Sequence, residues 1–253
     1  MHMESTLIST VVGSVFYVLS GGTLEYSVRK LKIKENKLIL MGASGAFIFA
    51  LQMLNFSIPY TGSSGHIGGG ILLAVLLGPY AGFLTMSLIL SVQCLFFNDG
   101  GLLALGCNIF NLGFFPCFIG YELIYKKIVK GKIDTKKIWI GSILSVMVSL
   151  ELGAFFVALE TFMSGNSEIL FKEFLMLMLP IHLAIGLVEG IVTAIILRFI
   201  FIKNSDIMKK TTTATLLLGC LLFGGIFSNF ASKLPDGLEW SIEKAKEKTI
   251  GIK

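Results

Sequence analysis

Long runs of apolar residues, separated by short polar segments, dominate the pattern along the chain. A membrane-spanning helix needs about 20 consecutive apolar residues, each adding about 1.5 Å of length. Most of the runs here are at or beyond that length. They occupy residues 5–22, 38–56, 69–97, 102–125, 138–163, 174–202 and 213–231. This pattern predicts an all-α polytopic membrane protein.

The positive charges fall in clusters between these runs. Lys and Arg gather at residues 29–37, 126–137 and 198–210. Short loops rich in Lys and Arg stay on the cytoplasmic side of a membrane. We therefore expect all three clusters to lie on one side.

This shared side determines how the run at 69–97 must cross. The runs at 38–56 and 102–125 supply two crossings between the first two clusters, so 69–97 crosses either twice or not at all. Gly78-Pro79 lies near its middle, where proline removes a main-chain donor and disfavours helix in the residue before it. We predict two short helices joined by an inner turn at 78–82. Seven crossings then precede residue 203, an eighth follows at 213–231, and the amino terminus lies outside.

The composition excludes a soluble protein. Hydrophobic residues make up 54% of the chain and charged residues 15%, with a mean hydropathy of +0.82. The formal charge of +5 follows from the loop clusters, so it reflects topology rather than nucleic-acid binding.

The four cysteines show no C-x-x-C spacing, which leaves no sign of a disulfide framework or a zinc site. Glu4 precedes the first run where a signal peptide would carry positive charge, so we expect that run to remain as a mature helix.

Two of the three histidines fall in outer segments. These segments are 1–4, 57–68, 98–101 and 164–173, and Lys172 is their single basic residue. Such a face does not repel a small cation. His2 and His66 lie in the first two segments, whereas His182 lies inside an apolar run.

A histidine at the second position of a chain is a strong chelator. The terminal amine of Met1, the main-chain nitrogen of His2 and the Nδ1 atom of its imidazole can close two rings on one ion. These nitrogens favour a square plane, which suits Ni(II) or Cu(II) and can be met by Co(II). A fourth nitrogen is needed, and His66, in a glycine-rich loop, is the candidate. Methionine removal generally needs a small second residue, so we expect the amine of Met1 to survive.

Four strings of residues resemble a known family, the substrate-binding (S) components of cobalt and nickel energy-coupling-factor transporters (the CbiM/NikM family). They are Met1-His2; Ser57-Ile58-Pro59-Tyr60-Thr61-Gly62-Ser63-Ser64-Gly65-His66; Gln93 with Phe96-Phe97-Asn98-Asp99-Gly100-Gly101-Leu102; and His182-Leu183-Ala184-Ile185-Gly186-Leu187-Val188-Glu189-Gly190. The resemblance covers most of residues 1–202. It implies a seven-helix S-component core and places the family's metal ligands on Met1, His2 and His66.

The tail carries a second resemblance. Leu234-Pro235-Asp236-Gly237-Leu238-Glu239-Trp240 looks like the motif of a small PDGLE-type accessory module. We therefore expect a metal-binding membrane domain at 1–205, then a C-terminal transmembrane helix with this tail at 206–253. After the second residue the chain continues Met3-Glu4-Ser5-Thr6, which departs from the family pattern and leaves open how the terminus is held.

The resemblance implies high-affinity capture of Ni(II) or Co(II) at the outer face of a prokaryotic plasma membrane. The ion would be transported substrate rather than a cofactor. No G-x-x-x-x-G-K-[ST] motif occurs, so ATP would be hydrolysed by two ATPase subunits, with a transmembrane coupling (T) subunit as the third partner. We expect no enzyme, because four nitrogens filling a square plane leave no equatorial position for a reactive water.

The remaining polar residues allow alternatives. Possible outer-shell partners of the ligands are Ser64, Asn98, Asp99 and His182. Glu151 and Glu189 lie in apolar runs, where an ionisable group is costly. They fit either acids packed between helices or the proton relay of a proton-coupled secondary carrier of divalent metal.

Small residues recur every fourth position at Gly42, Ala46 and Ala50 and at Gly186, Gly190 and Ala194, a spacing typical of close helix contacts.

Overall fold

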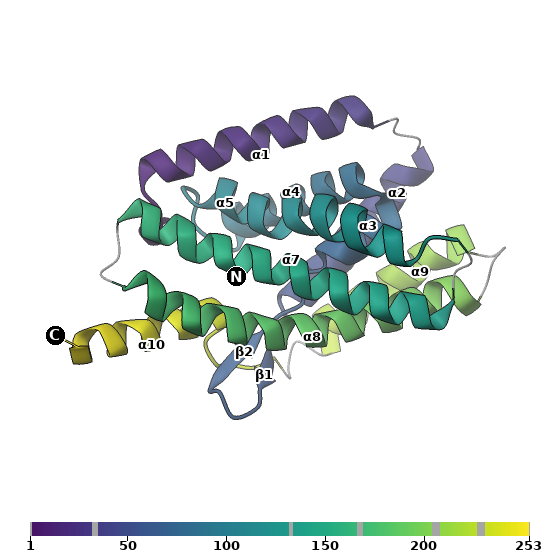
Figure 1. Ribbon diagram of the computed structural model, residues 1–253. Helices are drawn as coiled ribbons and strands as arrows, with labels where there is room; N and C mark the ends of the chain where they lie inside the picture. The colour runs from purple at the N-terminus through teal and green to yellow at the C-terminus, as the bar shows by residue number, and fades with distance from the viewer. Residues whose placement is uncertain are drawn as a thin grey trace.

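The computed structural model describes residues 2–31, 35–131, 134–165, 169–203, 208–226 and 231–252. The chain forms a bundle of long helices with one small hairpin at its side (Figure 1). Within these described residues, four helical runs are long and apolar enough to cross a membrane: α4 (Pro79–Phe96), the run Leu105–Ile128, α7 (Thr135–Ser164) and α8 (Phe171–Lys203). The protein is thus a multi-pass membrane protein, as the sequence predicts.

Two further helices lie in the first 52 residues. They are α1 (Thr10–Lys30), which follows a single 3₁₀ turn at Ser5–Leu7, and α2 (Glu35–Gln52). Ser9 caps α1, since its side chain accepts a hydrogen bond from the Val12 amide, and Asp134 caps α7 through the Lys137 amide. These caps satisfy amides that have no partner within the helix.

The predicted division of the run at 69–97 is confirmed, but its turn is shorter than expected. Helix α3 (Gly70–Leu77) ends at Gly78, which has a φ of 81°, and α4 begins at the next residue, Pro79. Proline is favoured as the first residue of a helix because that position donates no intrahelical hydrogen bond. Gly82 therefore lies inside α4, where its missing side chain allows close approach to the backbone of Ala74 in α3.

The run Leu105–Ile128 is continuous but not uniformly α-helical. It comprises α5 (Leu105–Ile109), a wider π-helical stretch η2 (Phe110–Tyr125) and the short α6 (Lys126–Ile128). Pro116 lies within η2 and cannot donate a main-chain hydrogen bond. Its ring packs where Gly70 begins α3, and no side chain larger than glycine fits there.

The described residues are mostly helical, as the all-α prediction requires, apart from one small hairpin. Strands β1 (Phe56–Ile58) and β2 (Ser63–Gly65) pair antiparallel, with Ser57 opposite Ser64. Tyr60 and Gly62 adopt positive φ values of 65° and 76° in the connecting turn. The segment expected to be a loop is therefore a hairpin that ends directly before His66.

The C-terminal part differs most from the prediction. Helix continues through α9 (Met208–Leu221) and η3 (Leu222–Ile226), so it begins earlier than the predicted residue 213. A further helix, α10 (Gly237–Ile252), was not predicted and packs along α8 (Figure 1). The Nζ atom of Lys248 in α10 lies 3.4 Å from the Oε2 atom of Glu173 in α8.

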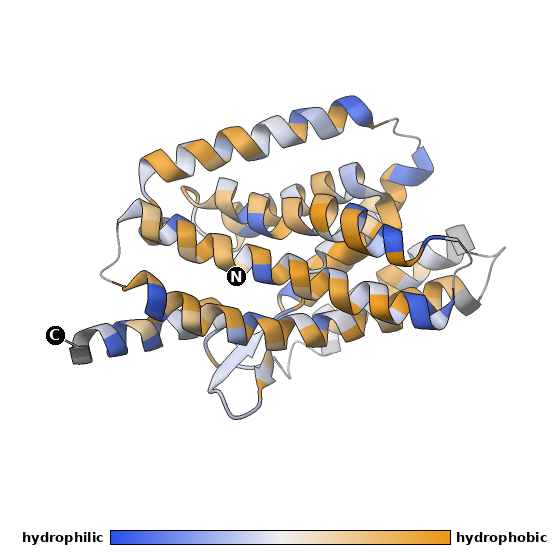
Figure 2. Ribbon diagram, in the orientation of Figure 1, coloured by the Kyte–Doolittle hydropathy of each residue, from blue (hydrophilic) through white to orange (hydrophobic). Residues whose placement is uncertain are grey.

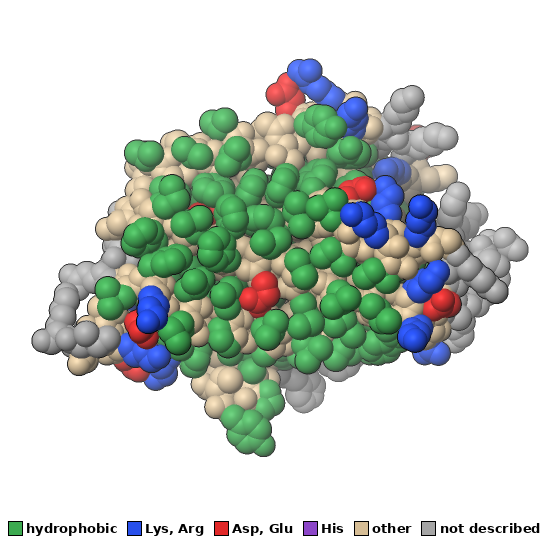
Figure 3. Space-filling model, viewed as in Figure 1, with side chains coloured by type: hydrophobic (Ala, Val, Ile, Leu, Met, Phe, Trp, Pro, Cys, Tyr) green, Lys and Arg blue, Asp and Glu red, His purple; other side chains and the backbone are tan. Residues whose placement is uncertain are grey.

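The surface agrees with a membrane location. Apolar residues follow the middle of the helices, and hydrophilic residues gather toward their ends (Figure 2). Large apolar side chains such as Val18 and Leu88 are exposed along the helices. On the face in Figure 3, Lys and Arg concentrate at the end of the bundle where α7 begins and α8 ends. That distribution supports one shared side for the basic clusters.

The two small-residue stripes have different surroundings. A Cβ atom built on Gly190 would lie 2.7 Å from the Ile143 Cα atom, and one on Gly186 would lie 3.3 Å from the Met147 Cα atom. The stripe at Gly186, Gly190 and Ala194 therefore packs α8 against α7. A Cβ atom on Gly42 would meet no described atom within 4 Å.

Gly190→Ala should consequently destabilise the protein, whereas Gly42→Ala should not. The added methyl group must push α7 and α8 apart, which costs about 1–3 kcal/mol. At Gly42 alanine is neutral or slightly stabilising, because it favours helix by up to about 1 kcal/mol. Thermal unfolding of both variants in the same detergent measures the difference, and equal melting temperatures would contradict this assignment of the interface.

Candidate metal site

His66 lies at the start of the segment that follows the hairpin. Its side chain is buried, with 9% of its surface exposed. Burial lowers the pKa of His66 to about 3, because the charged imidazolium loses its hydration. The imidazole is therefore neutral at physiological pH, which is the form that binds a metal ion.

The structure brings His2, from the segment before α1, against this histidine. The two imidazole rings are stacked, with centroids 5.2 Å apart and planes 12° from parallel. The sequence prediction that these two residues belong to one site is therefore consistent with the fold. Met1 lies outside the described residues.

Asp99 contacts His2 directly. Its Oδ1 atom lies 2.9 Å from His2 Nδ1. Burial alone would raise the pKa of Asp99, but its hydrogen bond and charge interaction with His2 lower it, so the group is a carboxylate. The Nε2 atom of His2 is buried and has no hydrogen-bond partner among the described residues. The carboxylate thus orients the imidazole through Nδ1.

Met3 is anchored by a residue that the sequence analysis did not single out. Asn108 of α5 accepts a hydrogen bond from the Met3 amide at 2.8 Å and donates one to the Met3 carbonyl at 3.1 Å. The same carbonyl accepts from the Gly101 amide at 2.8 Å, and the Met3 side chain is fully buried. Gly101 must lack a side chain, since a Cβ atom there would strike Ser5. One sign of this role is present in the sequence, because Asn108 is an amide side chain within an apolar run.

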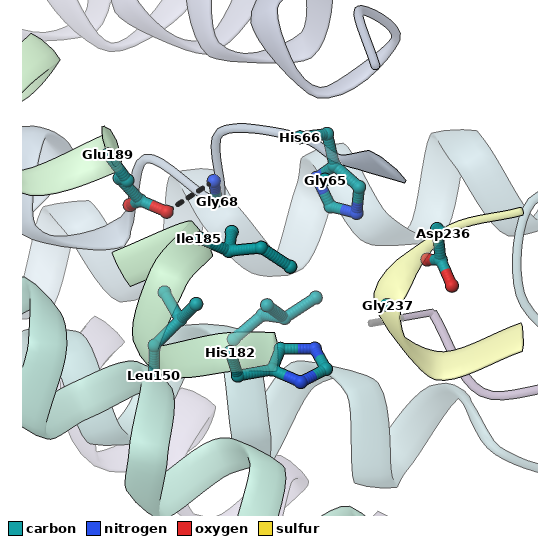
Figure 4. A pocket seen from close by; sticks show the side chains of 10 residues that line it. Gly65, His66, Gly68, Leu150, His182, Ile185, Glu189, Asp236 and Gly237 are labelled. Atoms are coloured by element: carbon teal, nitrogen blue, oxygen red, sulfur yellow. Dashed lines mark hydrogen bonds between the residues drawn. The ribbon is translucent and has the colours of Figure 1, made fainter. Parts of the chain in front are cut away.

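A pocket beside His66 joins three parts of the fold (Figure 4). The end of the hairpin supplies Gly65 and His66, α8 supplies His182, Ile185 and Glu189, and the start of α10 supplies Asp236 and Gly237. His182 is buried, and its Nδ1 atom lies 2.8 Å from the Met178 carbonyl of its own helix. A carbonyl only accepts, so the proton of neutral His182 is on Nδ1 and its Nε2 atom is an acceptor.

Two other predicted partners lie elsewhere. Ser64 is fully buried, but its amide and hydroxyl donate to the carbonyls of Pro235 and Leu234, each at 2.8 Å. Ser64 therefore binds the C-terminal segment. Asn98 is exposed and has a φ of 56° in the turn after α4, so its role there is in the turn.

Glu189 holds the backbone that follows His66. Its two carboxylate oxygens accept hydrogen bonds from the Gly68 and Gly69 amides, both at 2.8 Å, and Gln52 donates to the Gly68 carbonyl at 2.7 Å. Gly69 precedes the first residue of α3, where a negative charge is favoured by the helix dipole. These contacts favour the interpretation of Glu189 as a packed acid. Glu151 differs, because its buried Oε1 atom has no partner in the described part of the chain.

The described side chains do not form a metal site on their own. Among the described residues, no three or more His, Cys, Asp or Glu side chains are grouped so that they could hold a metal ion. A metal beside His2 and His66 therefore requires additional ligands, such as main-chain nitrogens.

Removing the Glu189 carboxylate should loosen the segment after His66. Hydrogen bonds to a charged group contribute about 1.5–3 kcal/mol each, so Glu189→Ala should accelerate hydrogen exchange of the Gly68 and Gly69 amides by at least tenfold. Glu189→Gln keeps one acceptor and should have an intermediate effect. Glu151→Ala is the matched control, since that acid lies in a spanning helix without contacting this segment. Unchanged exchange in both Glu189 variants would show that the clamp does not order the segment.

Comparison with known proteins identifies relatives among metal transport proteins. Residues 2–207 match the family model CbiM, "Cobalt uptake substrate-specific transmembrane region", and residues 210–251 match the PDGLE domain. A putative fused nickel transport protein NikMN of Archaeoglobus fulgidus is 35% identical over 83% of this chain and 68% of its own length. A putative cobalt transport protein CbiM 2 of Methanosarcina barkeri is 30% identical over 83% of this chain and 93% of its own.

Solved structures show the same fold. The crystal structure of a truncated transition metal transporter superposes with a TM-score of 0.71 at 27% identity, covering 81% of this chain and all of the other. A second transition metal transporter also has a TM-score of 0.71, at 26% identity and 85% coverage of this chain. The chain is therefore a transmembrane transport component for cobalt or nickel uptake rather than an enzyme, and it belongs to the CbiM family.

Proposed function

We propose that this chain captures Ni(II) or Co(II) at the outer membrane face through four nitrogens. They are the terminal amine of Met1, the main-chain nitrogen and Nδ1 of His2, and the imidazole of His66. The observation that carries the proposal is the stacking of His2 on a neutral, buried His66. Four nitrogens in a plane suit Ni(II) and can be met by Co(II).

The contacts of Met3 support a chelate that ends at the second residue. The Met3 amide donates its hydrogen to Asn108. Its nitrogen is therefore not available to a metal ion, whereas the amide before it can lose its proton and bind. Asn108 fixes the chain one residue beyond the ligands, which reduces the conformational entropy that the first two residues lose on binding.

The orientation of His2 must change when the ion binds. Its Nδ1 atom, which the chelate needs, lies against Asp99, whereas Nε2 has no partner in the described chain. A rotation of the ring about the Cβ–Cγ bond turns Nδ1 away from Asp99 and brings the edge that carries Nε2 toward it. Asp99 then acts on the ligand histidine through Nε2, as outer-shell carboxylates do at other metal sites.

Delivery into the cell depends on partners. The chain has no Walker A motif, so we assign nucleotide hydrolysis to two ATPase subunits and its transmission to a T subunit. In this proposal residues 1–205 form a seven-crossing S component with its amino terminus outside a prokaryotic plasma membrane, and residues 206–253 form an appended module. The hairpin follows the C-terminal end of α2, whereas the basic cluster at 29–37 lies at the other end of that helix, in agreement with an outer site.

A short extension before Met1 should abolish tight metal binding. It converts the terminal amine into an amide and removes one ligand, which costs more than the roughly 10–100-fold lost with an outer-shell partner. His2→Ala and His66→Ala should also lose at least about 100-fold in affinity by this comparison. Isothermal titration with Ni(II) and Co(II) measures the effect, and the same extension placed after Lys253 is the control. Full affinity in the amino-terminally extended protein would exclude the amine as a ligand.

Metal affinity should fall as the pH decreases from about 8 to 5, because protons compete with the metal ion for the amine and the amide nitrogen. His66 adds nothing to this dependence, since its pKa near 3 keeps it neutral throughout the range. His66→Ala should therefore lower affinity at every pH while leaving the slope of log affinity against pH unchanged. Titrations at several pH values test this, and a slope that flattens in the variant would show that His66 takes up a proton.

A further inference from the structure

The C-terminal module contacts the segment that carries His66. Ser64 pairs with Asp236 as neighbouring strand residues in parallel orientation, and its amide donates to the Pro235 carbonyl at 2.8 Å. The chain before Pro235 also runs beside the hairpin. There the Ser232 amide donates a hydrogen bond to the Asn55 carbonyl, directly before β1, at 2.7 Å. The module thus forms an isolated β-bridge beside β2, two residues before His66.

The turn at Pro235, Asp236 and Gly237 fills the space between the hairpin and α8. A Cβ atom on Gly237 would lie 3.1 Å from the His182 Cε1 atom and 3.0 Å from the Ile185 Cδ1 atom. Gly65 packs against the other side of Ile185, where a Cβ atom would lie 2.6 Å from Cγ1. Glycines at both positions therefore allow the turn to close the pocket that contains His66 and His182 (Figure 4).

Two features place the Asp236 carboxylate at this position. Its Oδ1 atom accepts from the Leu238 and Glu239 amides at 2.8 and 2.9 Å, and this capping holds the carboxylate in place. Asp236 also lines the pocket that contains His66 and His182. An anion in a partly buried site attracts a cation more strongly than one in water.

We infer that the turn at residues 235–237 is the outer wall of the metal site and that Asp236 retains the bound divalent cation by its charge. The inference rests on the proposed function, since it assumes that the ion lies beside His66. Asp236 acts as a positioning residue outside the four nitrogen ligands. The module therefore slows metal release, and the ion leaves after the pairing between Ser64 and Pro235 opens.

Asp236→Asn isolates the charge from the fold. Asparagine is as good a helix cap as aspartate, so α10 should stay in place while the negative charge is lost. The full chain is loaded with Ni(II), and metal release to an excess of chelator is followed. We expect release to be about tenfold faster in Asp236→Asn, a size typical of lost outer-shell partners. Glu239→Gln is the matched control, because Glu239 is an exposed acid in the first turn of α10 and glutamine can still accept the hydrogen bond from the Asp236 amide.

A second variant tests the position of the turn at residues 235–237 separately from the charge of Asp236. Gly237→Val places a branched side chain against His182 and Ile185, so the turn should be displaced and exchange of the Ser64 amide should rise at least tenfold. Faster metal release is expected in this variant too. Release equal to wild type in both Asp236→Asn and Gly237→Val would overturn the inference while leaving the proposed ligands intact. Failure of the wild-type chain to bind Ni(II) through His2 and His66 would instead overturn the proposed function.

Discussion

The return of the amino terminus into the bundle is the constraint on which the site depends. The end of a chain is normally poorly ordered unless specific contacts hold it. Here Asn108 satisfies both main-chain groups of Met3, and the buried Met3 side chain adds apolar contact. With residue 3 fixed, His2 is placed against His66 without requiring long-range order of its own. The departure of the sequence from the family pattern after His2 is therefore compensated by contacts from α5 and Gly101.

The sequence predicted the features that depend on local pattern. Apolar run length gave the long helices, and proline chemistry gave the division between α3 and α4. The pairing of His2 with His66 followed from topology and from a family resemblance. The turn at 78–82 was predicted too long because Pro79 was taken to interrupt the helix, whereas it is the first residue of α4. The hairpin was missed because its strands are only three residues long, too short for a periodic signal.

The contacts that position the ligands depend on tertiary structure, so no spacing in the sequence revealed them. Asn108 and Gln52 are single amides within apolar runs, and their partners lie far away in the chain. Ser64 was expected near the ligands but binds the module, since a main-chain strand pairing competes for its amide and hydroxyl. Asp99 was a possible outer-shell partner in the sequence analysis, and it contacts His2 at Nδ1, the nitrogen that the proposed chelate would use.

Hydrogen bonds hold the segment around His66 from two sides, and those on one side are stronger than those on the other. Glu189 binds it from α8 through two hydrogen bonds to a charged group, each worth about 1.5–3 kcal/mol, and Gln52 adds a third contact. On the other side the Ser64 amide and hydroxyl bind neutral carbonyls of the module, and such bonds contribute about 0.5–1.5 kcal/mol each. When the site opens, the module should therefore separate before the Glu189 clamp does. His66 then stays fixed to the membrane domain, and the ion leaves the site on the side where Asp236 lies.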